Sequence, residues 1–164
     1  MGDTYVEWMV KKKPSTGMNV LKGILIALTV IMVLLGMVIV IFWIPAIIFG
    51  LAAYFLNLQG NLEYEYLYVD KELAVDKIMA KTKRKKLERF SIERMEILAP
   101  IKSWHLDDFK NRQLKTIDYS SGVEKQPDIR YVMIYNGEKR VIFEPNTEMV
   151  KAIQSVAPRK VFLD

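Results

Sequence analysis

The chain has 164 residues, of which 51% are hydrophobic and 26% are charged, and its formal net charge is +5 at pH 7. It contains no cysteine and one histidine, His105, which excludes disulfides, thiolate chemistry and clusters of histidine ligands. A disordered chain and a purely soluble protein are also excluded, because the hydrophobic residues are concentrated in one long block, and the chain is too short for a large enzyme. The sequence therefore indicates where the protein resides more clearly than what it binds.

The apolar block runs from Gly23 to Leu56 without a charged residue. It is longer than the about 20 residues that one helix needs to cross a bilayer, and Pro45 suits the first turn of a new helix better than the interior of an old one. We therefore expect a transmembrane helical hairpin over residues 21–58, with helices at about 21–41 and 45–58. A cleaved signal peptide is a poor alternative, because its apolar region spans only about 7 to 15 residues.

Basic residues flank this block on both sides. They are Lys11, Lys12, Lys13 and Lys22 before it, and Lys71, Lys77, Lys81, Lys83, Arg84, Lys85 and Lys86 after it. Because such residues are retained in the cytoplasm, both flanks favour the same side and an even number of crossings. The sequence predicts a two-pass protein of the cell (inner) membrane with both termini cytoplasmic. The block holds no aspartate, glutamate, histidine, lysine or arginine, which favours an anchor over a transport pathway.

After Gly60 the pattern changes to the two-residue alternation of a strand, with tyrosines at 64, 66 and 68 on one face of the first strand. These tyrosines predict a packed sheet face. Further strands are expected at 73–79, 87–91, 95–99, 114–119, 129–135 and 139–143, and Asn136-Gly137 predicts a tight hairpin. Residues 102–112 form a loop or a short helix. A final amphipathic helix is capped by Asn146 and ended by Pro158.

Seven short antiparallel strands followed by one helix match the pleckstrin-homology (PH) arrangement. Two apolar helices that lead directly into residues 62–73 and then a basic turn resemble the bacterial PH-like membrane proteins. The sequence, especially residues 63–80 and 157–162, also resembles a family of short, uncharacterised membrane proteins of clostridial-type bacteria. This resemblance implies an α+β protein: an N-terminal two-helix transmembrane hairpin, then a cytoplasmic PH-like antiparallel β-sheet domain over 61–164 with a C-terminal helix. It implies no established activity.

Residues 1–20 are expected to form a separate N-terminal segment, cytoplasmic or interfacial. Within it, the stretch from Tyr5 to Val10 precedes three lysines and contains Trp8. Tryptophan beside lysines suits the headgroup layer of a membrane, but the same stretch suits an edge strand of the domain. Both alternatives remain open at this point.

A basic run between two expected strands is the candidate functional site. Its charged members are Lys81, Lys83, Arg84, Lys85 and Lys86. We expect it to form a hairpin tip, and a solvated tip is its simplest interpretation; contact with an anionic membrane surface is the candidate function, and protein binding is a further alternative. The connection between the first two strands is the nearly neutral Asp70-Lys71-Glu72, whereas phosphoinositide-binding PH domains carry their basic signature there. Specific phosphoinositide recognition is therefore not predicted.

Other polar clusters do not predict chemistry. His105 is close in sequence to Asp107 and Asp108, but adjacent residues point in different directions and make no metal site or acid–base pair by proximity alone. Ser120-Ser121-Gly122 reads as a turn. Basic and acidic residues nearly balance after Asn57, so no nucleic acid partner is expected. We predict no catalytic residue, metal or cofactor and no enzyme.

The leading functional hypothesis is a membrane-anchored, non-catalytic module. Its partners would be the lipid bilayer and either a protein partner or a second copy of the chain in a homo-oligomer. The alternative is an accessory subunit of a larger membrane complex, such as a transporter, in which the helical hairpin makes the specific contacts.

Overall fold

The computed structural model describes residues 4–164, which form two compact units. The first, called the helical unit here, comprises residues 13–62 together with residues 79–83. The second, called the β unit, comprises the chain up to Lys12, residues 63–78 and residues 84–164. The two N-terminal helices thus form one unit, and both sheets with the C-terminal helix form the other, in the α+β class that the sequence predicts.

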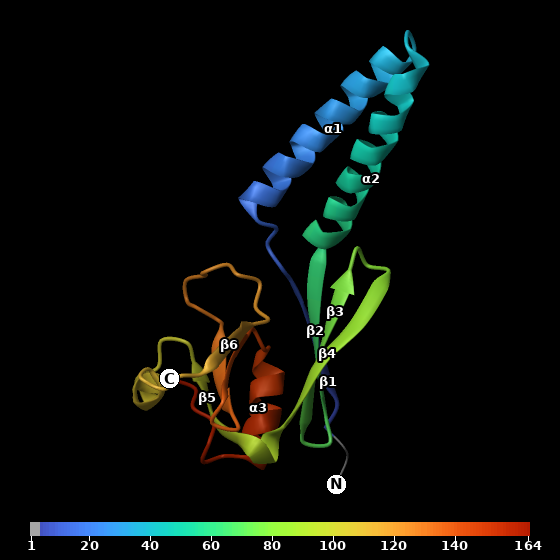
Figure 1. The fold of residues 1–164 in the computed structure, drawn as a ribbon. Helices are drawn as coiled ribbons and strands as arrows, with labels where there is room; N and C mark the ends of the chain where they lie inside the picture. The colour runs from blue at the N-terminus through green and yellow to red at the C-terminus, as the bar shows by residue number, and fades with distance from the viewer. Residues whose placement is uncertain (1–3) are drawn as a thin grey trace. The chain divides into compact units, whose positions relative to one another are not determined.

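The helical unit contains α1 (Thr16–Gly36) and α2 (Trp43–Gly60), joined through the short 3-10 helix η1 (Val40–Phe42). Figure 1 shows the two helices side by side and antiparallel. Residues 16–36 and 40–60 are each 21 residues long and apolar enough to cross a membrane. At 1.5 Å per residue, each is about 31 Å long, close to the about 30 Å of a hydrocarbon core.

The turn of this hairpin comes earlier than the sequence predicts. The first helix ends at Gly36 rather than near residue 41, because the Trp43 indole folds back on it and its Nε1 donates to the Gly36 carbonyl at 3.1 Å. A Cβ atom on Gly36 would lie 3.1 Å from the Trp43 ring. The absence of a side chain at this position therefore permits the tight return of the chain.

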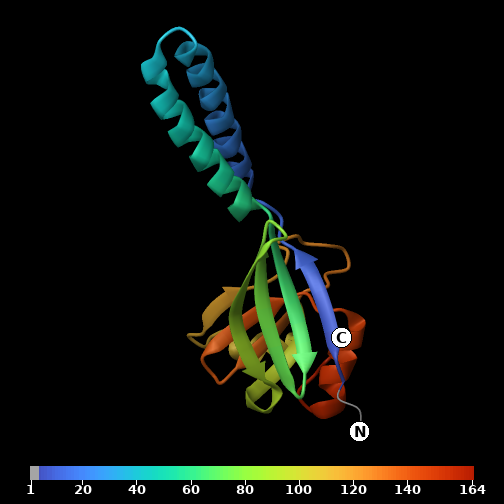
Figure 2. The same ribbon diagram turned by 90° about the vertical axis from the view of Figure 1, so that its right-hand side faces the viewer.

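The first sheet has the strand order β1-β2-β3-β4, as Figure 2 shows. The strands are β1 (Val6–Lys11), β2 (Leu62–Val69), β3 (Glu72–Met79) and β4 (Lys83–Ser91). Asp70 and Lys71 connect β2 to β3 with φ of 49° and 64°. Positive φ at both central residues is typical of the two-residue turns whose twist matches a hairpin.

Strand β1 resolves the two alternatives for the N-terminal stretch. It pairs antiparallel with β2, from Val6 opposite Tyr68 to Lys11 opposite Glu63, and it also contacts the C-terminal helix. Val6 and Val10 are buried in the core. Residues 6–11 are therefore part of the sheet and not of a separate or interfacial segment. Without them, one edge of β2 would have no hydrogen-bonding partner and the core would lack the two valine side chains. Residues 1–3 lie outside the described chain.

The second sheet has the order β5-β7-β8-β6. Its strands are β5 (Met95–Pro100), β6 (Lys115–Asp118), β7 (Tyr131–Tyr135) and β8 (Lys139–Phe143). The predicted Asn136-Gly137 hairpin is confirmed, with φ of 57° and 67° at the two residues. One pairing was not anticipated: β6 runs parallel to β8, since the connection from 119 to 130 and β7 together carry the chain across the sheet.

Two short 3-10 helices complete this unit: η2 (Ile92–Arg94) joins the sheets, and η3 (Trp104–Phe109) occupies the stretch expected as a loop or short helix. The last element is α3 (Thr147–Val156), whose N-terminus is capped by the Asn146 side chain accepting from the Met149 amide at 2.9 Å. Both sheets and α3 share one hydrophobic core, which includes the three predicted tyrosines. The helix closes this core through Met149, Val150 and Ile153, all buried.

Replacing Ile153 by alanine should lower the free energy of unfolding by about 2 to 5 kcal/mol, because the side chain is completely buried and its loss leaves a cavity. The measurement is urea unfolding of a linked domain, defined as residues 4–12 joined to residues 61–164 by a short Gly/Ser linker. The linker is short because Lys11 and Glu63 are paired neighbours. Lys151→Ala, on the exposed side of the same helix, is the control. Equal stability of the two variants would show that α3 is not docked.

Candidate functional site

The basic run lies on the β3–β4 hairpin, but only its first residue occupies the turn. Ala80 and Lys81 have φ of 49° and 60°, which closes the hairpin, and β4 begins at Lys83. The expectation that the whole run forms the tip is therefore wrong, because two residues with positive φ suffice to reverse the chain and pairing resumes at once. All five basic side chains are exposed.

The turn lies directly beside the end of α2. The Ala80 amide donates to the Asn61 carbonyl at 2.8 Å, and Asn61 is the residue that follows the last residue of α2, Gly60. Lys81 and Lys83 are thus at the base of the helical hairpin, inside the helical unit. The sequence contains a signal for this placement, because the two alternating stretches that form β2 and β3 are equally long and are joined by a two-residue turn. The end of β3 therefore has to return to the start of β2.

The base of the helical unit is positively charged and has no compensating acid. Residues 13–62 and 79–83 contain four lysines and neither aspartate nor glutamate. These lysines are Lys13, Lys22, Lys81 and Lys83. Within residues 4–164, none of them lies within 4.0 Å of a carboxylate. The arrangement can attract anions, and its charge is available to them.

Arg84 differs from the other members of the run. Its Nη2 lies 2.7 Å from the Glu65 carboxylate on β2, which is 3% exposed. Burial raises the pKa of Glu65, a hydrogen bond with Glu7 raises it further, and the Arg84 charge opposes both effects. Arg84 therefore stabilises a buried carboxylate in the sheet, and its charge is less available to an external anion than those of Lys83, Lys85 and Lys86. Sequence alternation alone does not reveal that Glu65 is buried.

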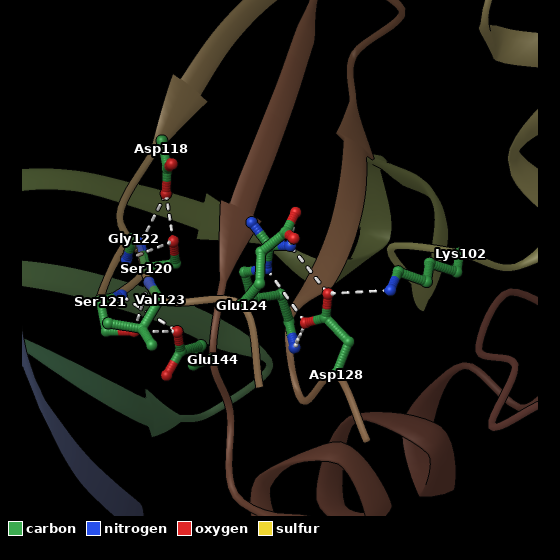
Figure 3. A network of polar contacts seen from close by, with 10 residues as sticks. Lys102, Asp118, Ser120, Ser121, Gly122, Val123, Glu124, Asp128 and Glu144 are labelled. Atoms are coloured by element: carbon green, nitrogen blue, oxygen red, sulfur yellow. Dashed lines mark hydrogen bonds and ion pairs between the residues drawn. The ribbon is translucent and has the colours of Figure 1, made fainter. Parts of the chain in front are cut away.

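A second polar cluster contains the buried Glu144, and Figure 3 shows this residue beside Ser121. The backbone amide of Ser121 donates to its Oε1 at 3.1 Å, and the Ser121 hydroxyl donates to the same oxygen. The Glu144 amide in turn donates to the Tyr66 hydroxyl at 3.3 Å, and Tyr66 donates to the Tyr119 carbonyl. These bonds tie the connection after β6 to β2 and β8. Of the two serines expected in a turn, Ser121 thus satisfies a buried carboxylate, whereas Ser120 donates to the exposed Asp118.

His105 and its acidic neighbours do not converge. The imidazole stacks between Trp104 and Phe162, with ring centroids 3.8 and 3.7 Å away, and its Nε2 lies 3.8 Å from Asp164. Asp107 instead pairs with Lys110. In the described part of the chain, no three His, Cys, Asp or Glu side chains are grouped as metal ligands would be. The basic run remains the candidate site.

Replacing Arg84 by alanine in the linked domain should destabilise it by about 1 to 2 kcal/mol near pH 7.5, because Glu65 loses its cationic partner while buried. Because folding raises the pKa of Glu65, this residue contributes most to the stability of the folded state when its carboxyl group is protonated. That contribution is lost as the pH rises through the raised pKa. The deficit of the variant should therefore shrink as the pH falls. Urea unfolding between pH 5 and 8 measures it, with Lys85→Ala as the control; a pH-independent deficit contradicts the interpretation.

Comparison with known proteins agrees with this architecture. No curated protein and no solved structure matches the chain. The family model described as a bacterial PH-like domain (DUF6106) matches residues 2–163, which include the helical hairpin as well as both sheets and α3. The similarity to clostridial-type membrane proteins stays a prediction. Because the match covers nearly the whole chain, the protein belongs to this bacterial PH-like family.

Proposed function

We propose that this protein is a non-catalytic PH-like module anchored in the inner membrane by its helical hairpin, with a basic surface that binds the anionic cytoplasmic leaflet. The observation that carries this proposal is the hydrogen bond from the Ala80 amide to the Asn61 carbonyl. It holds Lys81 and Lys83 beside the residue that leaves α2. If α2 crosses the bilayer, these lysines lie at the level of the headgroups.

The pairing of β1 with β2 supports a hairpin that returns to its starting side. Lys11 precedes the helices and Glu63 follows them, yet these two residues are paired neighbours in one sheet. A single crossing would place β1 and β2 on opposite sides of the membrane and abolish the sheet. The basic residues on both flanks favour the cytoplasm for this side.

Electrostatics gives the scale of the lipid contact. Each lysine near an anionic surface contributes on the order of 1 kcal/mol, screened beyond a Debye length of about 8 Å. Lys81, Lys83, Lys85 and Lys86 together set an upper bound of about 4 kcal/mol, which corresponds to about millimolar binding. Such attraction is weak for a free domain and effective for a tethered one, because the anchor keeps the local concentration high.

The partners of the buried carboxylates support the non-catalytic part of the proposal. PH-like domains are generally non-catalytic. In this chain the buried carboxylates of Glu65 and Glu144 are occupied by Arg84 and by Ser121, so each has a structural partner. The module would act by keeping the surface of its PH-like domain next to the membrane, where a second protein can bind to it.

Reporter fusions test the topology. A reporter active only in the cytoplasm should be active when fused after Asp164, and a reporter active only outside should be active when inserted in the turn at residues 38–39, because the hairpin crosses twice. Fusion of the cytoplasmic reporter after Lys12 should match the C-terminal fusion. Opposite sides for Lys12 and Asp164 would exclude the hairpin.

Vesicle cosedimentation tests the lipid contact. The linked domain should associate weakly with vesicles containing anionic phosphatidylglycerol and not with pure phosphatidylcholine, and salt should weaken the association steeply. Changing Lys81, Lys83 and Lys85 to glutamate should abolish it while sparing the Arg84–Glu65 pair. The matched control carries the same charge change at three exposed lysines elsewhere: Lys115, Lys125 and Lys151. Equal loss in both triple variants would mean that binding reports net charge alone.

A further inference from the structure

Lys22 is the charged residue within the helical hairpin, and it faces the neighbouring helix. It lies six residues after Thr16, or about 9 Å along the axis of α1. Its Nζ donates to the Asn57 side-chain oxygen on α2 at 2.6 Å. The two residues line a small recess of about 40 Å³ at the base of the hairpin, together with Asn19 and Asn61.

The charge of Lys22 is not compensated by the protein. Asn57 supplies a hydrogen bond but no negative charge, and the helical unit contains no aspartate or glutamate. Across residues 4–164, no carboxylate lies within ion-pair distance of Lys22. A cation at this depth is costly unless it reaches water or an anion. The two remaining N–H donors of the ammonium are therefore suited to an anion from outside the chain.

The lining of the recess favours a phosphate group as the anion. The recess is lined by amide side chains, which donate hydrogen bonds and leave the net charge positive. The recess is small, with a volume of about 40 Å³, so it suits the oxygens of one phosphate better than a larger group such as a sugar. Lys13, Lys81 and Lys83 add positive charge in the same unit. Basic pockets between membrane helices on the cytoplasmic side are known to bind anionic headgroups.

We propose that the Lys22–Asn57 recess binds the phosphodiester of one anionic phospholipid as a resident ligand. The proposal rests on the proposed function in requiring an inserted hairpin. It differs from the diffuse attraction of the basic run, because one lipid is held at a defined stoichiometry. Since the lipid supplies the missing negative charge, it also fastens α1 to α2 at their open end.

Native mass spectrometry of the full chain in a neutral detergent tests this proposal. The protein is incubated with an equimolar mixture of phosphatidylglycerol and phosphatidylcholine that have acyl chains of distinguishable mass. Both lipids carry a phosphodiester, but the choline of phosphatidylcholine would bring a further positive charge to a unit that already holds four lysines and no acid. We therefore expect one phosphatidylglycerol to be retained preferentially. Asn57→Asp should lower the preference about tenfold, because it places a carboxylate against Lys22 and neutralises the site while keeping the hydrogen bond.

The matched control is Gln59→Glu, which makes the same charge change at an exposed position two residues along α2. It should retain the lipid as the unmodified protein does. Lys22→Gln should lose the lipid and Lys22→Arg should keep it. Circular dichroism of each variant verifies that the helices are intact, and because Asn57→Asp preserves the contact to Lys22, it reports on the site even where Lys22→Gln unfolds.

Inorganic phosphate distinguishes the source of the phosphate. If millimolar phosphate displaces the lipid and stabilises lipid-free protein equally well, the recess is a site for a soluble anion and the lipid assignment is wrong. Equal retention of the two lipids, or an unchanged preference in Asn57→Asp, overturns the proposal. Either result leaves the reporter fusions and the cosedimentation of the linked domain unaffected, so failure of the recess is distinguishable from failure of the anchor.

Discussion

The antiparallel pairing of β1 with β2 is the constraint on which the rest of the structure depends. It joins the residues before the helical hairpin to those after it, with Lys11 opposite Glu63. The helices are therefore an insertion between two neighbouring strands of one sheet. The same pairing completes the core, because Val6 and Val10 face it from the outer strand and α3 packs against that strand.

The distribution of charge follows from this connectivity. Two strands of equal length, β2 and β3, carry the chain away from the helices and back, so the turn at Lys81 returns to Asn61. Acidic residues are confined to the β unit, where Glu65 is balanced by Arg84. The lysines of the helical unit lack such balance. One end of the hairpin thus has a positive surface that the protein itself does not neutralise.

Local patterns predicted most of the elements. Alternation identified β2 and β3, Asn136-Gly137 fixed one hairpin, and the Asn146 cap fixed the start of α3. These features depend on residues close in sequence, whose preferences act before tertiary contacts form. The position of the basic run within the β3–β4 hairpin was less accurate, because the ends of strands depend on individual φ angles such as that of Ala80.

Long-range features could not be predicted in this way. The edge position of β1 depends on a partner beyond both helices, and the parallel pairing of β6 with β8 depends on a crossover. The burial of Glu65 and Glu144 depends on partners 19 and 23 residues away. A single sequence carries no direct signal for pairs of residues so far apart. From sequence alone, each of the two carboxylates would be predicted to face the solvent. The charge of the candidate site was thus predictable, and its hydrogen-bonded setting was not.

The separation of β1 from β2 has a consequence for biosynthesis. Translation produces β1 first, but its partner emerges only after both helices have been made. During this interval the apolar side chains of β1 have no sheet to join. The sheet closes only after β2 has been made and has returned to β1. Formation of this sheet is therefore a late step that depends on the return of the chain through α2: a chain whose second helix does not pack against the first leaves both strands without their partner.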